Sequence, residues 1–120
     1  MFIEDVNIHK MSVSDDIDHV DPNDVTLVEC MLGYDIRVDG ERVGSIEGIL
    51  GELEYLVVEP HCQDKGIARA ALNEFVSLSR VNGFSEVTTN NAIHPAMEHI
   101  LETEGFERQS DEIGWMKEIC

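Results

Sequence analysis

The segment from Val58 to Ala68 combines residues that could hold a charged ligand. An apolar run ends at Val58, a loop follows, and a helical pattern opens at Gly66. The first N–H groups of a helix lack partners within it and carry the positive end of its dipole, so small residues there let a diphosphate approach closely. Gly66 and Ala68 would give that access. The same arrangement also occurs in αβ proteins as a plain connection between a strand and a helix.

The patterning around this segment predicts the elements that position it. Asp39-Gly40 separates two alternating runs, over 34–38 and 41–46, and this favours a type I′ hairpin. A third strand over 53–58 is ended by Pro60, which cannot donate to a central ladder. An apolar stripe then predicts a helix of about four turns from Gly66 to Asn82-Gly83.

The two ends of the chain carry weaker signals. The N-terminal part predicts a strand over 8–13, a short helix over 14–17, and a second helix from Asp21 to Gly33, with a strand over 25–31 as the alternative because β-branched residues are frequent there. The C-terminal part predicts a strand over 84–89, a helix from His94-Pro95 to Gly105, and closing strands over 106–109 and 113–117.

Length and composition predict one soluble domain spanning residues 1–120. The chain has 120 residues, of which 42% are hydrophobic, so it can bury one core. It contains no apolar run of the roughly 20 residues that a membrane helix needs, and its first residues do not have the layout of a signal peptide. The odd number of cysteines, 3, implies neither a disulfide framework nor a metal site, which fits a cytoplasmic location.

The charge is strongly acidic, with 25 Asp and Glu against 8 Lys and Arg. Nucleic acid and anionic membranes are poor partners for such a surface, because both attract clustered basic residues. The formal net charge of -17 opposes compaction by self-repulsion, which concentrated salt screens. The composition resembles that of haloarchaeal proteins and predicts a halophilic protein; an ordinary acidic cytosolic protein is the alternative.

Spacing ties the loop to a known family. Gln63-x-x-Gly66-x-Ala68, between a strand and an Ala-rich helix, resembles motif A of the GNAT N-acetyltransferases. The stretch from His94-Pro95-Ala96 to Gly105-Phe106 is similar to the second signature of the family, and the front of the chain resembles its first strand and helix. The resemblance implies an α+β GNAT fold: a mixed, mostly antiparallel sheet of about six to seven strands, helices on both faces, and a splayed strand pair at the coenzyme A site.

The resemblance also implies which residues bind the cofactor, acetyl-CoA. Main-chain groups of Leu56, Val57 and Val58 would pair with the pantetheine arm, although their side chains could simply be core. His94 replaces the common asparagine that contacts this arm. The amides of Gln63, Asp64, Lys65, Gly66, Ile67 and Ala68 would hold the diphosphate, with Lys65 and Arg69 as countercharge. The stretch over 63–69 contains two cations and Asp64, so its net charge is +1. The chain as a whole has a net charge of -17, so the residues outside this stretch sum to -18.

For catalysis, the resemblance implies that Glu52 acts as the general base, with Glu54 as a weaker candidate and a solvated glutamate as the plain alternative. Leu101 stands where the family usually has the tyrosine that serves as general acid, and His99 could substitute from the same helix. Cys62 is interpreted as a small loop residue and not as a nucleophile.

Three functions follow from these observations. The first is an N-acetyltransferase that moves the acetyl group of acetyl-CoA to an amine, either a small molecule or a protein. The second is a non-catalytic GNAT-like module, favoured by Leu101, which could act in a homodimer or larger assembly. The third is an acidic αβ domain without a ligand. The acceptor is not identified, because the family forms the acceptor wall from its variable first helices, here residues 14–33.

The acidic composition leads to a first prediction about salt. The melting temperature should rise steeply as KCl increases from about 0.1 M to above 1 M, because the Debye length falls from about 10 Å to about 3 Å and self-repulsion is screened. Differential scanning calorimetry across that range would measure the effect. A melting temperature that stays flat or falls would contradict the halophilic interpretation.

Overall fold

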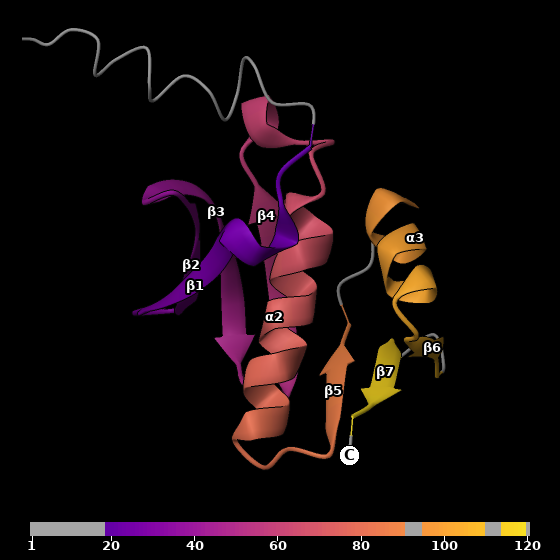
Figure 1. The fold of residues 1–120 in the computed structure, drawn as a ribbon. Helices are drawn as coiled ribbons and strands as arrows, with labels where there is room; N and C mark the ends of the chain where they lie inside the picture. The colour runs from indigo at the N-terminus through magenta and orange to yellow at the C-terminus, as the bar shows by residue number, and fades with distance from the viewer. Residues whose placement is uncertain (1–18, 91–94, 110–113, 120) are drawn as a thin grey trace, which may run out of the picture.

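The computed structural model describes residues 19–90, 95–109 and 114–119. Within them one seven-stranded sheet has the order β1-β2-β3-β4-β5-β7-β6. Its strands are β1 (Val25–Cys30), β2 (Gly33–Val38), β3 (Glu41–Ile49), β4 (Glu52–Val58), β5 (Glu86–Thr89), β6 (Glu107–Arg108) and β7 (Trp115–Glu118). The helices are α2 (Ile67–Val81) and α3 (Pro95–Thr103), with single 3-10 turns η2 (Pro22–Asp24) and η3 (Pro60–Cys62). Figure 1 shows α2 lying across β4, with α3 on the side of β5 and β7.

The predicted hairpin is confirmed as β2 and β3. Asp39 has φ 52° and Gly40 has φ 84°, the two positive values that a type I′ turn requires. The strand that follows, the long helix and the α3 helix are also where the sequence predicts them. The closing strands are shorter than predicted: β6 has two residues, and the predicted start of β7 lies outside the described residues.

The predicted helix from Asp21 to Gly33 is wrong, and the alternative strand is correct. Asp21 does cap a turn, accepting a hydrogen bond from the Asn23 amide at 2.9 Å, but the turn is the short η2 and β1 begins at Val25. β1 pairs antiparallel with the whole of β2, and those ladder bonds favour the extended state for a β-branched stretch. The predicted strand over 8–13 and helix over 14–17 lie outside the described residues, and so the prediction of helices on both faces remains a prediction.

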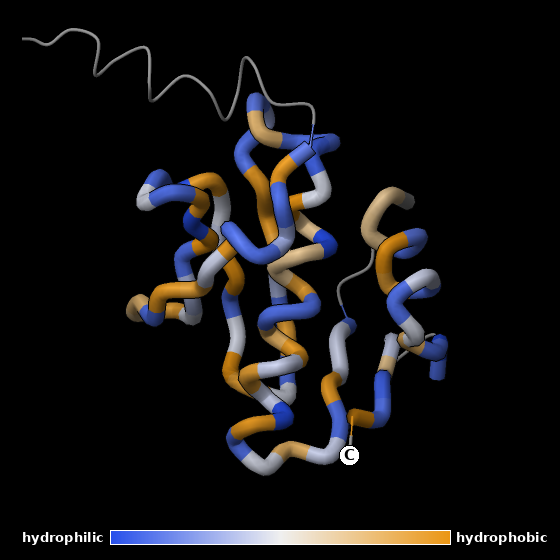
Figure 2. Tube along the Cα trace, in the orientation of Figure 1, coloured by the Kyte–Doolittle hydropathy of each residue, from blue (hydrophilic) through white to orange (hydrophobic). Residues whose placement is uncertain are grey.

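The core lies between α2 and the sheet. Along α2 apolar and polar residues alternate with helical spacing (Figure 2), and the apolar side, including Leu72, Phe75 and Val76, is buried. The Phe75 ring meets the Tyr34 ring of β2 edge to face, with centroids 6.2 Å apart. Ile36 and Ile46 of the sheet are fully buried in the same cluster. This packing holds α2 against the sheet.

The predicted splayed strand pair is present. β4 pairs antiparallel with β3 as far as Val58, but it pairs in parallel with β5 only through Glu52 and Leu53. The β3 register shifts between Glu47 and Gly48, so that Glu54 is an extra residue in β4 just beyond the last pair with β5. Past Leu53, therefore, β4 and β5 no longer share a ladder.

Two kinds of feature are absent from the described residues: a membrane-spanning helix and a cluster of metal ligands. None of the helices among them is long and apolar enough to cross a membrane. No group of three or more His, Cys, Asp or Glu side chains gathers among them in a way that could hold a metal ion.

Candidate cofactor-binding site

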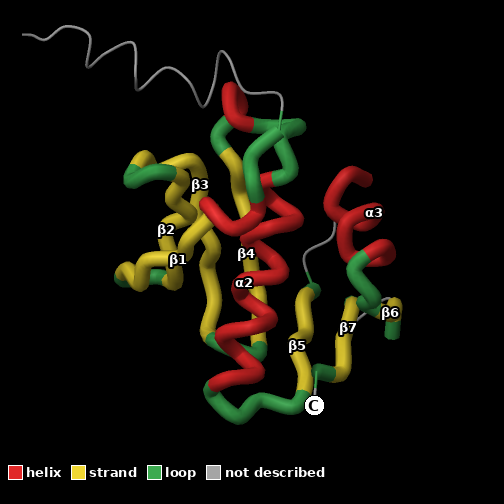
Figure 3. Tube along the Cα trace, in the orientation of Figure 1, coloured by secondary structure: helices red, strands yellow, loops and turns green. Residues whose placement is uncertain are grey.

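Figure 3 shows the loop that joins β4 to α2, with the single turn η3 within it. Its own hydrogen bonds hold this loop in shape. The amide of Cys62 donates to the Glu59 carbonyl at 2.8 Å and closes η3. The Gln63 side chain folds back, and its Nε2 donates to the Val58 carbonyl at 3.0 Å. The Cys62 side chain is fully buried under the loop. Gln63 therefore ties the loop to the end of β4.

The first amides of α2 have no acceptor within the helix. Gly66 is the N-cap, and it has a left-handed backbone, φ 83°, that favours glycine. The first bond of the helix runs from the Ala70 amide to the Gly66 carbonyl at 3.1 Å. The amides of Ile67, Ala68 and Arg69 precede that bond, so they have no acceptor within the helix, and the first turn carries no acidic residue. These amides and the helix dipole make the position suited to an anion.

His19 lies beside the candidate site, although no sequence motif indicates it. The amide of Val20 donates to the Lys65 carbonyl at 2.9 Å, which fastens the start of the described chain to the loop. A β-carbon on Gly66 would lie 2.6 Å from Cε1 and 2.8 Å from Nε2 of His19. The imidazole therefore occupies the space that a side chain at position 66 would need. No local motif could reveal this contact, because it joins residues far apart in the sequence.

Arg69, predicted as a countercharge for the diphosphate, is engaged by the end of α3. Its Nη1 donates to the Thr103 hydroxyl at 2.6 Å and forms an ion pair with Glu104. The Thr103 hydroxyl in turn donates to the His99 carbonyl at 2.9 Å. The first turn of α2 is thus tied to the last turn of α3. Lys65, the other predicted countercharge, is half-buried in the loop.

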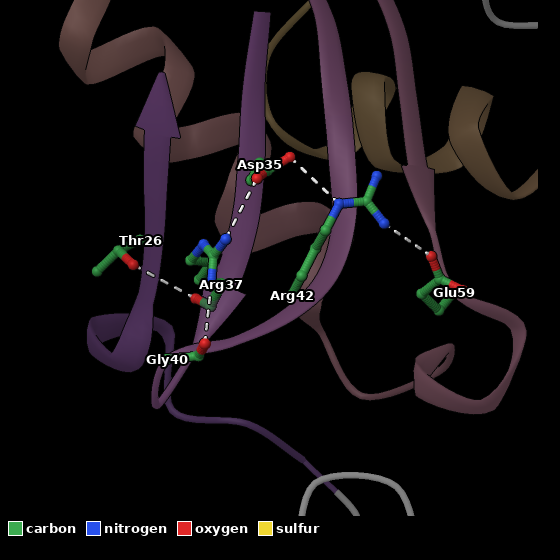
Figure 4. A network of polar contacts seen from close by, with 6 residues as sticks. All are labelled: Thr26, Asp35, Arg37, Gly40, Arg42 and Glu59. Carbon is green, nitrogen blue, oxygen red and sulfur yellow. Dashed lines mark hydrogen bonds and ion pairs between the residues drawn. The ribbon is translucent and has the colours of Figure 1, made fainter. Parts of the chain in front are cut away.

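A network of charged side chains braces the loop from the neighbouring strands (Figure 4). Arg42 of β3 bridges Asp35 and Glu59, with 3.2 Å to each carboxylate. Arg37 donates to the Gly40 carbonyl at 2.9 Å and meets Asp35 at 3.4 Å. Exposed ion pairs each contribute at most about 1 kcal/mol. Their effect here is to connect β2, β3 and Glu59, the residue that opens the loop.

The three residues predicted along the pantetheine arm lie at the end of β4. Val58 is buried and Leu56 packs against the core, so their side chains follow the structural alternative. The Val57 side chain is 53% exposed. The Val57 main chain is taken up by Ser45 of β3, because hydrogen-bonded pairs alternate along an antiparallel ladder and the Val57 carbonyl faces β3. The Val58 carbonyl is used by Gln63, which leaves the Leu56 main chain and the Val58 amide as the part that could meet a ligand. His94, the other predicted contact, lies outside the described residues.

The predicted acid and base positions differ in their surroundings. Glu52 and Glu54 are both exposed on β4; Glu52 lies in the paired segment and Glu54 just beyond it. Leu101 is fully buried, and its carbonyl accepts from the Phe106 amide at 2.9 Å. The position of the family tyrosine is therefore filled by core packing. His99 is exposed on α3.

Cys62 is a poor nucleophile in this environment. Burial raises the pKa of its thiol, and the carboxylates of Glu41 and Glu59 raise it further, while the Lys65 ammonium lowers it. The balance is upward, so the thiol stays protonated at neutral pH. This supports the interpretation of Cys62 as a loop residue that packs.

Comparison with solved structures identifies the fold. A GNAT-family protein of Desulfovibrio desulfuricans, described as a candidate acetyltransferase, superposes with a TM-score of 0.58 at 20% identity, over 72% of this chain and 68% of its own. The candidate N-acetyltransferase YhhK of E. coli, solved bound to coenzyme A, superposes with a TM-score of 0.57 at 19% identity, over 98% of this chain and 92% of its own. No protein-family model and no curated protein matches the sequence significantly. The chain has the α+β fold of the GNAT acetyltransferases.

The contrast between two cysteines gives a prediction on thiol reactivity. Cys30 is exposed on β1 and Cys62 is buried with a raised pKa. In a Cys120→Ser background, a disulfide reagent should modify Cys30 more than about 100-fold faster than Cys62, because Cys62 must await local opening. Mass spectrometry after timed quenching would measure both rates. Equal rates in the folded protein would contradict the buried position of Cys62.

Proposed function

We propose that this protein is an N-acetyltransferase that binds acetyl-CoA at the loop between β4 and α2 and transfers the acetyl group to an amine. The proposal depends on two features that occur at the same end of the sheet. The first amides of α2 have no acceptor within the helix, and β4, the strand that leads into this loop, is paired with β5 only through Glu52 and Leu53. A solved structure with this fold, YhhK, is bound to coenzyme A.

In the proposed binding mode, successive parts of acetyl-CoA contact the loop and then β4. The amides around Gln63, Asp64, Lys65, Gly66, Ile67 and Ala68 hold the diphosphate, with Lys65 as the nearby cation. The pantetheine arm follows the Leu56 main chain and the Val58 amide, along the side of β4 that β5 leaves unpaired. The thioester then lies toward Leu53, where the two strands separate.

The proposed chemistry is direct attack. A neutral amine attacks the thioester carbonyl carbon, the C–N bond forms, the C–S bond breaks, and coenzyme A leaves as a thiolate. Glu52, directly or through water, accepts the proton that the amine gives up. Glu54 is the second candidate, because it is the first residue beyond the last pair with β5. Since Leu101 has no proton to donate, water protonates the thiolate.

The main alternative is a non-catalytic module that binds acetyl-CoA. The packing of Leu101 favours it, because the position of the family's general acid is fully buried. Stoichiometric binding of acetyl-CoA without turnover against a panel of small amines and peptides would decide for the module. The same result excludes a domain without a ligand.

Charge reversal in the loop tests the binding site. Lys65→Glu should weaken acetyl-CoA binding about 10-fold or more, because it replaces a cation beside the diphosphate with an anion. Isothermal titration at fixed KCl would measure this, with Lys117→Glu on β7 as the matched control. Lys65→Glu is the cleaner test than a substitution of Gly66, where any side chain would strain the backbone and meet His19.

Unchanged affinity for acetyl-CoA in a folded Lys65→Glu variant would show that the diphosphate does not bind at this loop. An equal loss in both variants would show that net charge, and not position, controls binding.

Removal of a carboxylate tests the reaction. Glu52→Gln should lower kcat by about 10²- to 10⁴-fold while acetyl-CoA affinity stays native, because the carboxylate acts on the acceptor's proton and not on the cofactor. Glu54→Gln is the matched variant two residues along the same strand. A loss confined to Glu54→Gln would move the base to that residue, and wild-type rates in both would exclude a carboxylate base on β4.

A further inference from the structure

The His19 imidazole lies against the helix start that the proposed function assigns to the diphosphate. Its Cε1 and Nε2 atoms would be 2.6 and 2.8 Å from a β-carbon on Gly66, so the ring sits directly against this residue. The start of the described chain runs beside the loop above α2 (Figure 1), and the Val20 amide bonds to the Lys65 carbonyl. The backbone next to His19 is therefore tied to the loop.

The imidazole also has the chemistry that an anion needs. His19 is exposed, so a ligand at the start of α2 can reach it. A neutral imidazole has one N–H donor and a protonated one has two. Arg69, the cation that sequence spacing favours for this role, is already bonded to Thr103 and Glu104.

We propose that His19 is a further ligand-binding residue, which donates a hydrogen bond from its imidazole to a diphosphate oxygen of acetyl-CoA. This inference rests on the proposed function, because it requires the diphosphate to lie at the start of α2. It gives Gly66 a second role: besides its left-handed backbone, the missing side chain makes room for the ring. It also makes residues 19–20 a third segment of the site, beside the loop and α2.

Three substitutions separate hydrogen bonding from packing. Isothermal titration of acetyl-CoA at fixed KCl should show about 10-fold or greater loss for both His19→Ala and His19→Phe, and a change within about 3-fold for His19→Gln. Phenylalanine fills the space over Gly66 but donates nothing, whereas glutamine keeps a donor. Asn73→Ala, at an exposed position in the middle of α2, is the control and should bind normally.

A ligand that lacks the diphosphate provides the second control. S-acetylpantetheine, followed by ligand-detected NMR, should bind the wild type and His19→Phe equally, because the proposed contact involves only the diphosphate. An equal loss for both ligands would show that His19 shapes the loop and does not touch the diphosphate.

The remaining outcomes are distinct. If the wild type does not bind acetyl-CoA, the proposed function fails and the inference fails with it. If the wild type binds and His19→Phe binds as well as His19→Gln, only the inference is overturned. If His19→Ala fails to fold, the comparison of His19→Gln with His19→Phe still tests whether a hydrogen-bond donor at this position is needed for binding.

Discussion

The separation of β4 from β5 after only two residue pairs is the constraint on which the rest of the site depends. β3 holds β4 as far as Val58, so β4 keeps its extended shape although β5 leaves it beyond Leu53. Main-chain groups on that side then need partners from outside the sheet, because a buried N–H or carbonyl without one is costly. The same strand leads into the loop and α2, so the gap and the first amides of the helix occur at one end of the sheet.

A strongly acidic protein that binds a polyanion faces opposing electrostatic effects. The net charge of -17 repels a diphosphate at long range. Salt shortens the range of that repulsion to about 3 Å near 1 M, whereas hydrogen bonds made at contact by backbone amides are far less affected. In concentrated salt, amides, a helix dipole and an imidazole N–H donor would therefore bind a diphosphate more effectively than a cluster of exposed cations would. The ion pair between Arg69 and Glu104 agrees with this view, because Arg69, one of the few cations, connects α2 to α3.

The inner side of α3 serves packing. Leu101 and Phe106 are buried together with the core, and the Arg69 contacts fix the end of the helix. In the proposed reaction, the proton for the leaving thiolate would consequently come from solvent, and the catalytic carboxylate would be supplied by β4. The two exposed glutamates of β4 differ in their strand pairing: Glu52 pairs with β5, and Glu54 lies in the bulge just beyond the last pair.

Local sequence rules were sufficient where an element is stabilised by its own neighbours. Asp39-Gly40 specifies its turn through two positive φ angles, and the apolar stripe of α2, with Gly66 and Asn82 at its ends, indicates where the helix begins and ends. The spacing around Gln63 also located the loop. Residues 21–33 were misassigned because a capping signal at Asp21 is local, whereas the β1 ladder that overrides it is formed by β2.

By itself, then, the sequence determined the hairpin, the long helix, the anion-suited loop between β4 and α2, and the acidic character of the whole chain. Only the tertiary structure decided that Arg69 faces Glu104, that Leu101 is sealed in the core, and that His19 lies over Gly66. The physical reason is the range of the interactions involved. Turns and helix ends are determined by dihedral preferences of adjacent residues, while these three contacts exist only after packing of the sheet and α2 has brought distant segments together.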